Sequence, residues 1–305
     1  MEKSRPNIES FTYIPRIVGP IVQTPAFPTG DFGRAFYDLM ERDAETNFPG
    51  NKYINPLQIN EETGEVSGTH LFGVARASQL ITPMNLGIRL VSLADCAEPQ
   101  ILEMIRGRHY LIMPAAVLRS TKDSFNTQNE PLARYLAERV QGFSPELPAY
   151  IRGFGVEAWP EDIKGYRSKL VPLNGKSFEF LLDDRFSQKY NRWKFTQVDK
   201  NGIPIGLTDP NNFKGENGRT WYTRGDGLSR VYVDSDGNVD SDDARLAISG
   251  GNGRVAFVSD KVARAQNFSA ANLLQNTWGR ELVRRLQGAR EYLSELERQI
   301  ETESQ

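Results

Sequence analysis

The sequence contains very little cysteine and histidine. Cys96 is the 1 cysteine among 305 residues, which excludes an internal disulfide framework and a cysteine-cage metal site. The 2 histidines, His70 and His109, are too few for a histidine-rich metal site. A Ser-His-Asp or Cys-His catalytic site needs a histidine as its base, and neither histidine lies in a motif that indicates this role. The sequence therefore favours a protein that is not an enzyme and has no cofactor, with Ca²⁺ as the one alternative considered below.

Long hydrophobic runs and a strong net charge are also lacking. No run of about 18 apolar residues is present, so we expect no membrane span. The N-terminus has no apolar segment of the kind a secretory signal contains, which predicts a cytoplasmic protein or one within a particle assembled there. The net charge of −2 argues against coating nucleic acid or an anionic membrane, since those partners select a basic surface.

Proline is concentrated in residues 1–30, where it alternates with large apolar side chains. Repeated proline blocks helix and central strand and favours extended backbone. The interleaved apolar residues indicate that the segment is not a simple solvated tail. We expect an extended arm, which lies either along its own domain or on a neighbouring subunit.

Residues 31–165 are expected to form a mixed α/β region. A helix should begin near Asp31, because Phe32, Phe36, Leu39 and Met40 make one apolar face. Further helices should begin near Pro99 and Pro131, and strands are expected over 86–93 and 110–118. Residues 46–69 read as a loop, and the proline-rich and glycine-rich stretch 143–176 reads as a linker or irregular cover.

Residues 166–265 are expected to be β-rich and antiparallel. The strongest hairpin signal is Asp226-Gly227 between candidate strands at 221–223 and 228–233, because tight hairpin turns need residues with φ > 0. Asp236-Gly237 marks another turn. The fold class we expect is therefore α+β: the small mixed region, the antiparallel region, and a long C-terminal helix.

The C-terminal helix is expected over 266–305. Its apolar residues follow a heptad spacing of 4, 3, 4, 3 and 4, which is typical of a helix that pairs with another. These residues are Leu282, Leu286, Ala289, Leu293, Leu296 and Ile300. We call them the seam, and we predict that they form an interface with another copy or another subunit.

The chain also carries an acidic loop at 234–243. Its carboxylates would repel one another unless something separates or neutralises them. Three interpretations are open: a hydrated hairpin tip, a ligand-facing loop, or a Ca²⁺ cage. In the last, Gly237 would take the turn position of an EF-hand-type loop, although Tyr232 stands first where an aspartate is usual. The Ca²⁺ ligands would then include Asp234, Asp236, Asp240 and Asp243.

The order of strand, Asp/Ser/Asn-rich loop, strand, glycine turn and strand over residues 228–258 resembles the ligand-binding end of C-type-lectin-fold domains. This resemblance covers about 30 residues and implies ligand recognition, with or without Ca²⁺. The disulfides of that fold have no counterpart here.

Three functions follow from these patterns. The leading hypothesis is a non-enzymatic structural or interaction protein, a subunit of a virion-like or other repeating assembly, because a proline-spaced arm and a heptad helix flank the chain. The first alternative is a ligand-recognition protein that uses the acidic loop. The second is a hydrolase whose carboxylates meet in the folded state. The adjacent pairs Asp183-Asp184 and Glu161-Asp162 read as surface charge, because neighbours on a strand point to opposite faces.

Overall fold

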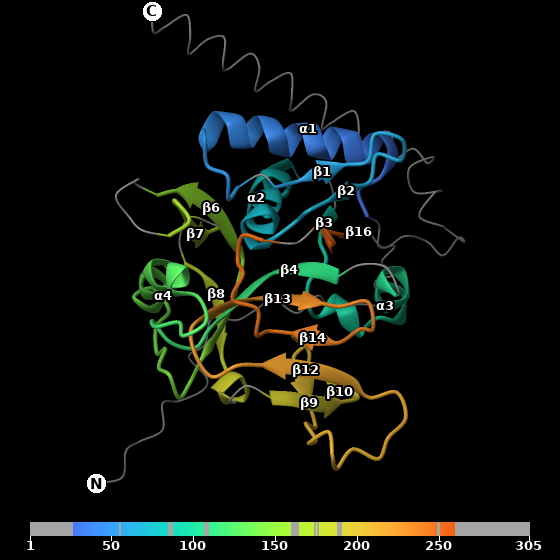
Figure 1. Cartoon of the computed structure of the whole chain (residues 1–305), viewed down its shortest axis with the longest axis vertical. Coiled ribbons are helices and arrows are strands. Elements are labelled where there is room, and N and C mark those ends of the chain that lie inside the picture. Colours follow the sequence, from blue (N-terminus) through green and yellow to red (C-terminus); the bar gives the residue numbers. More distant parts are fainter. Residues whose placement is uncertain are drawn as a thin grey trace, which may run out of the picture.

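One large sheet organises the part of the chain that the structure describes. The computed structural model describes residues 27–259, except for 55, 85–87, 107–109, 160–164, 174, 176, 188–190 and 249–250. The eight-stranded sheet has the strand order β8-β5-β4-β13-β14-β12-β9, and β15 pairs with β4 (Figure 1). Its pairs are antiparallel except for β12–β14 and β15–β4, which are parallel. The strands are β4 (Tyr110–Leu118), β5 (Ala149–Arg152), β8 (Glu179–Leu182), β9 (Asn191–Phe195), β12 (Arg219–Thr223), β13 (Leu228–Val233), β14 (Val239–Asp240) and β15 (Gly253–Arg254).

Strand β4 lies near the middle of the sheet and is interrupted at Pro114. Most of its residues are buried, as expected for a strand covered on both faces. Proline has no backbone N–H to donate, so it cannot take a normal place in a central strand. On one side, Arg230 pairs with Ala116 but Tyr232 pairs with Ile112, and on the other side the pairing with β5 ends at Ala115. The ladder is therefore broken next to Pro114 on both sides of β4.

Helices α1 (Gly30–Asn47) and α2 (Leu71–Ile81) contribute to one hydrophobic cluster with β4. The apolar face predicted for α1 is confirmed, since Phe32, Phe36, Leu39 and Met40 are all buried. Helix α2 begins at His70, whose side chain accepts a hydrogen bond from the backbone N–H of Gly73. No pattern in the sequence predicted α2.

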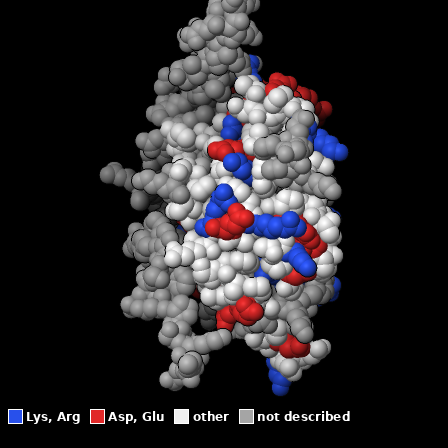
Figure 2. All heavy atoms as spheres, turned by 90° about the vertical axis from the view of Figure 1, so that its left-hand side faces the viewer, with Lys and Arg blue, Asp and Glu red and all other residues white. Residues whose placement is uncertain are grey.

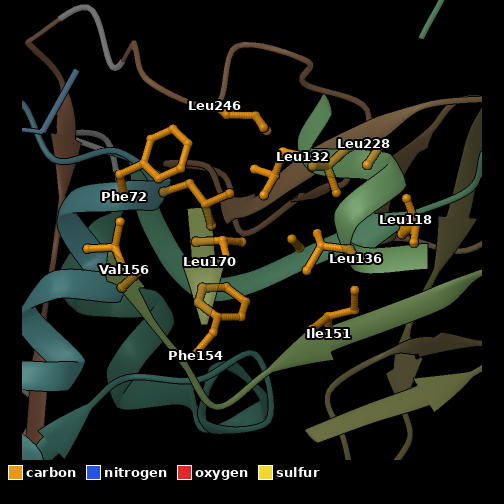
Figure 3. Packing of buried hydrophobic residues seen from close by; sticks show 14 of the residues in the cluster. Phe72, Leu118, Leu132, Leu136, Ile151, Phe154, Val156, Leu170, Leu228 and Leu246 are labelled. Carbon is orange, nitrogen blue, oxygen red and sulfur yellow. The ribbon is translucent and has the colours of Figure 1, made fainter. Parts of the chain in front are cut away.

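A second hydrophobic cluster lies between α2, α4 (Glu130–Ala137) and the strands β4, β5, β6 (Phe154–Ala158) and β7 (Ser168–Pro172). Figure 3 shows Leu132 and Leu136 of α4 facing Leu118 and Ile151 of the sheet. Phe72 of α2 and Phe154 belong to the same cluster. The cluster therefore joins residues that lie more than a hundred positions apart in the sequence, such as Phe72 and Leu246.

The remaining elements are short. The strand pairs are β1 (Gln58–Ile59) with β2 (Val66–Ser67), β3 (Ile88–Leu90) with β16 (Phe257–Ser259), β6 (Phe154–Ala158) with β7 (Ser168–Pro172), and β10 (Gln197–Val198) with β11 (Pro204–Ile205). The helix expected at Pro99 is α3 (Pro99–Ile105). Within the described ranges, 3₁₀ helices span Thr82–Met84, Asp95–Ala97, Thr127–Asn129 and Asp184–Ser187. Helices and strands together confirm a mixed α+β composition.

The expectation of an irregular stretch at 143–176 is wrong. This stretch contains β5, β6 and β7, and β5 lies inside the large sheet between β8 and β4. Gly153 separates β5 from β6 with a φ of +65°, a backbone conformation that glycine adopts without a Cβ clash. The glycines and prolines here mark bends between short strands. The ranges 31–165 and 166–265 both supply strands to this one sheet.

The hairpin expected at Asp226-Gly227 is also wrong, although the turn exists. Gly227 has a φ of +71°, and the turn connects β12 to β13. These two strands do not pair with each other, because β14 lies between them. At Gly227 an added Cβ would lie 2.4 Å from the Arg224 guanidinium. Only glycine therefore fits at this position of the turn, next to the buried Arg224 side chain.

Two expected elements lie outside the described residues. They are most of the arm at 1–30 and the C-terminal helix at 266–305, including all of the seam. The described chain starts at Phe27, which packs against the cluster formed around Trp221. None of the helices in the described ranges is long and apolar enough to cross a membrane.

Candidate functional site

The acidic loop is a tight connection between β13 and β14. Asp234 organises it: one carboxylate oxygen accepts from the backbone N–H groups of Asp236 and Asn238, both at 2.9 Å, and the other accepts from the Asn238 amide at 2.9 Å. Gly237 supplies the turn with a φ of +79°, which confirms the turn predicted at Asp236-Gly237. Both oxygens of Asp234 are therefore occupied by the loop itself, as in an Asx turn.

Asp243 is engaged by two arginines. Its carboxylate accepts from Arg230 at 2.7 Å and from Arg245 at 3.0 Å. Burial raises the pKa of Asp243, but the hydrogen bond from Arg245 and the charge of Arg230 outweigh burial and bring the pKa below its ordinary value. Asp243 is thus a charged, structurally paired carboxylate.

The four proposed Ca²⁺ ligands have different surroundings. Asp234 and Asp243 have the partners just described, Asp236 is exposed, and Asp240 is buried. In the described ranges, no three His, Cys, Asp or Glu side chains lie close enough together to hold a metal ion. Ca²⁺ binding by this loop stays a prediction, to be tested in solution.

Asp240 and Asp242 form the group with the most unusual electrostatics. Asp240 lies on β14 opposite Tyr232 of β13 and Tyr222 of β12, and it is 9% exposed. It shares hydrogen bonds with Asp242 and with the Tyr232 hydroxyl. Burial, followed by the charge of Asp242 and the hydrogen bond with it, raises the pKa of Asp240 from 3.8 to about 8. Asp240 can therefore hold and release a proton near neutral pH, the property required of a general acid or base.

Ser241, which lies between the two aspartates in the sequence, is held by hydrogen bonds from two buried side chains. Its hydroxyl accepts from Arg119 at 3.1 Å and from the Trp221 indole at 3.0 Å. Arg119 also donates to Ser229 Oγ at 2.7 Å and to the Phe186 carbonyl at 2.9 Å. Arg119 therefore has three neutral hydrogen-bond partners, and none of them is a carboxylate. Burial, and then the charge of Arg224, lower the pKa of Arg119 to about 9.

A second buried arginine sits nearby in a different environment. Arg224 donates to Asp123 at 2.6 Å, and both side chains are 0% exposed. Asp123 also accepts from Asn129 at 2.7 Å and from the backbone N–H of Leu228 at 3.2 Å. The Phe125 ring covers the guanidinium at 5.1 Å. This network closes the end of the sheet where the loop after β4 meets the β12–β13 turn.

The two conventional candidates for catalysis are in unreactive environments. His70 is fully buried at the start of α2, and burial, followed by the charge of Arg230, lowers its pKa to about 3. Cys96 is buried as well, and burial raises its pKa, so the thiol stays protonated. His109 lies outside the described residues.

Other charged residues are used by their own elements. Glu157 and Lys169 are directly opposite on β6 and β7 and form an ion pair at 3.1 Å. Glu130 and Arg134 pair at 2.7 Å along α4, and such pairs add local stability. On the face shown in Figure 2, basic and acidic side chains lie next to one another. Asp183 pairs with Arg185, while Glu161 and Asp162 lie outside the described residues.

Sequence reasoning missed Arg119, Arg224 and Asp123. The one available signal was a basic residue beside or within an otherwise apolar strand, as at Arg119 after β4 and Arg230 in β13. Comparison of the chain with protein-family models, curated proteins and solved structures finds no match. The assignment of function therefore depends on the residues and their geometry.

Proposed function

We propose that this protein is a non-enzymatic structural or interaction protein that acts as a subunit of a larger, virion-like or other repeating assembly. The observation that carries the proposal is the seam, which repeats apolar residues with heptad spacing from Leu282 to Ile300. Such a repeat buries its apolar side chains when two helices pair. The proline-spaced arm at residues 1–30 provides a second segment for contacts with a neighbour.

Two exposed apolar side chains on the described body support the same proposal. Phe125 is 61% exposed and Ile248 is 58% exposed. They lie on loops that touch each other, since the Asn126 side chain donates to the Ala244 carbonyl at 3.3 Å. Both loops are anchored by buried arginines, Arg224 beneath Phe125 and Arg230 at the Ile248 carbonyl. Apolar side chains held on fixed loops suit a contact with a neighbouring subunit.

The test is the native mass of the full-length protein. Replacing Leu286 and Leu293 together by aspartate puts two charges into the seam, so we expect a lower native mass than in the wild type. The matched control is Gln287→Asp with Ser294→Asp, which adds the same charge one position away from the seam residues and should keep the wild-type mass. If the seam variant keeps both its mass and its melting temperature, the seam is not an interface.

The arm is tested by removing residues 1–26, which leaves Phe27 in place against its cluster. We expect a folded protein with an altered oligomeric state. A truncated protein that unfolds while it is still monomeric would place the arm in the fold of its own domain and contradict its role in assembly.

The two alternatives from the sequence have distinct signatures. If the acidic loop recognises a ligand, Asp236→Asn should weaken the binding of that ligand. A carboxylate hydrolase requires a substrate to reach Asp240, and the activity should then follow the ionisation of that group. Neither alternative predicts a change of native mass in the seam variant, so the mass measurement separates them from the proposed function.

A further inference from the structure

A small cavity lies beside the break in the sheet at Pro114. Its volume is about 160 Å³. A cavity of about 150 Å³ is large enough for a benzene ring, so this one fits a compact molecule of roughly six to ten non-hydrogen atoms. The cavity lies where the pairing of β4 with β5 ends at Ala115. Its walls are mainly apolar and come from Ile81, Leu90, Leu93, Pro114, Ala115 and Leu173.

The charged groups of the cavity are hydrogen-bond donors, and the hydroxyl residues Ser78, Thr82 and Ser92 also line it. Tyr150 and Arg152, neighbours along β5, both line it, together with Arg89. Tyr150 is 2% exposed, and its hydroxyl has no hydrogen-bond partner among the described residues. Burial raises the pKa of Tyr150, so this hydroxyl keeps its proton. An acceptor on a ligand in the cavity would give this hydroxyl a partner.

Each arginine that lines the cavity forms an ion pair with a carboxylate. The Arg152 Nε atom lies 3.2 Å from Glu179, and Arg89 contacts Asp95 at 2.6 Å. The terminal nitrogens of Arg152 make no hydrogen bond to a described residue. No aspartate or glutamate is among the described residues that line the cavity. The charged side chains at the cavity are thus cations, and no carboxylate among the described residues lines it.

We propose that this cavity binds a small carboxylic acid with an apolar body, whose carboxylate accepts hydrogen bonds from Arg152 and Tyr150. The body of the acid lies against the apolar walls. A carboxylate suits this pair better than a neutral acceptor, because it accepts from both donors at once and charge-assisted bonds are about twice as strong as neutral ones. The inference does not depend on the proposed assembly function, since it concerns residues of one chain.

Benzoate is a suitable probe, and benzyl alcohol is its neutral counterpart of similar size. Calorimetric titration of the full-length protein should show saturable benzoate binding at about 1 mM or tighter. Benzyl alcohol should bind about tenfold more weakly. Arg152→Gln and Tyr150→Phe should each weaken benzoate binding about tenfold while affecting benzyl alcohol less. Ser78→Leu places a larger side chain at the half-buried wall position on α2 and should remove binding of both probes.

The control is Arg134→Gln, which changes an arginine paired on the surface of α4 and should leave benzoate binding unchanged. Absence of saturable benzoate binding at about 10 mM would overturn the proposal, and so would wild-type binding by both Arg152→Gln and Ser78→Leu. Equal affinity for the two probes would overturn the role of the carboxylate. If Ser78→Leu does not fold, the comparison of Arg152→Gln with Arg134→Gln decides.

Discussion

Arg119 and Arg224 are both buried at the same end of the sheet, yet their surroundings differ. Arg224 meets the carboxylate of Asp123 at 2.6 Å, so its charge is compensated at contact distance. Arg119 is surrounded by two hydroxyls and a carbonyl. The aspartates near Arg119, Asp240 and Asp242, are hydrogen bonded to each other instead.

The difference shows where the molecule responds to pH. A contact ion pair keeps both partners charged over a wide range, whereas separated buried charges move their ionisation toward neutral pH. The pKa values of about 8 for Asp240 and about 9 for Arg119 follow this rule. The region of Arg119 and Asp240 should therefore act as the titrating one, while Asp123 and Arg224 form a buried contact pair.

Breaking the compensated pair should have the largest effect. Asp123→Asn would leave the Arg224 guanidinium buried without a counter-charge, and we expect a loss of about 3–5 kcal/mol in the free energy of unfolding. Urea denaturation at pH 7 measures this loss. Asp236→Asn, an exposed aspartate in the loop, is the control and should change stability by less than about 0.5 kcal/mol. A loss for Asp123→Asn as small as that of the control would show that the pair is not a stabilising contact.

The titrating region is tested through Asp240→Asn. Because folding raises the pKa of Asp240 from 3.8 to about 8, its contribution to stability is complete below about pH 4 and is lost as the pH rises toward 8. The asparagine variant does not carry this loss. Its stability relative to the wild type should increase between pH 5 and 8 by up to about 1.4 kcal/mol per pH unit.

Denaturation curves of Asp240→Asn and the wild type across this range give the difference directly, and Asp236→Asn again serves as control. A difference that stays constant with pH would mean that Asp240 is ionised in the folded protein at pH 5.

A smaller effect is expected from Arg119→Met. This change removes the Arg119 charge and its hydrogen bonds to three neutral partners. Because no carboxylate contacts Arg119, the change leaves no opposite charge unpaired. Ser241 keeps its bonds to Trp221 and to the Tyr222 carbonyl. We expect a loss of about 1–2 kcal/mol in the free energy of unfolding, less than for Asp123→Asn. An equal or larger loss would remove the distinction between the two arginines.

The smallest effect is expected from Ca²⁺. Since Asp234 and Asp243 are occupied by other partners, thermal melts with millimolar Ca²⁺ and with a chelator should coincide. A melting temperature that Ca²⁺ raises in the wild type, but not after joint replacement of Asp240 and Asp242 by asparagine, would instead establish a Ca²⁺ site in the loop.

Local patterns predicted some elements well. The spacing of Phe32, Phe36, Leu39 and Met40 predicted α1, because that helix has one buried face and one solvated face. Pro99 marked the start of α3. Helix α2 was not predicted, because Leu71 to Ala77 are all buried. The segment therefore has no polar face, and its sequence shows no helical period.

The candidate sites were less accessible to sequence reasoning. The acidic loop was identified, but Asp240 was proposed as an ion ligand, and its raised pKa follows from burial between β12 and β13. Arg224 meets Asp123 at a separation of 101 residues, and Arg119 meets Ser241 at 122 residues. The cavity is lined by residues that range from Ser78 to Leu173 in the sequence. Contacts of this range come from the topology, which no local pattern contains.

The position of β14 has a consequence for how the chain folds. Strands β12 and β13 are consecutive, so they emerge during synthesis before β14, yet they must leave a slot between them. A β12–β13 hairpin, the fast local step for consecutive antiparallel strands, would be a non-native trap. Only the two residues Val239 and Asp240 fill the slot. Until they insert, two strand edges have unpaired backbone groups, and those edges are where we expect the newly made chain to be most prone to aggregation.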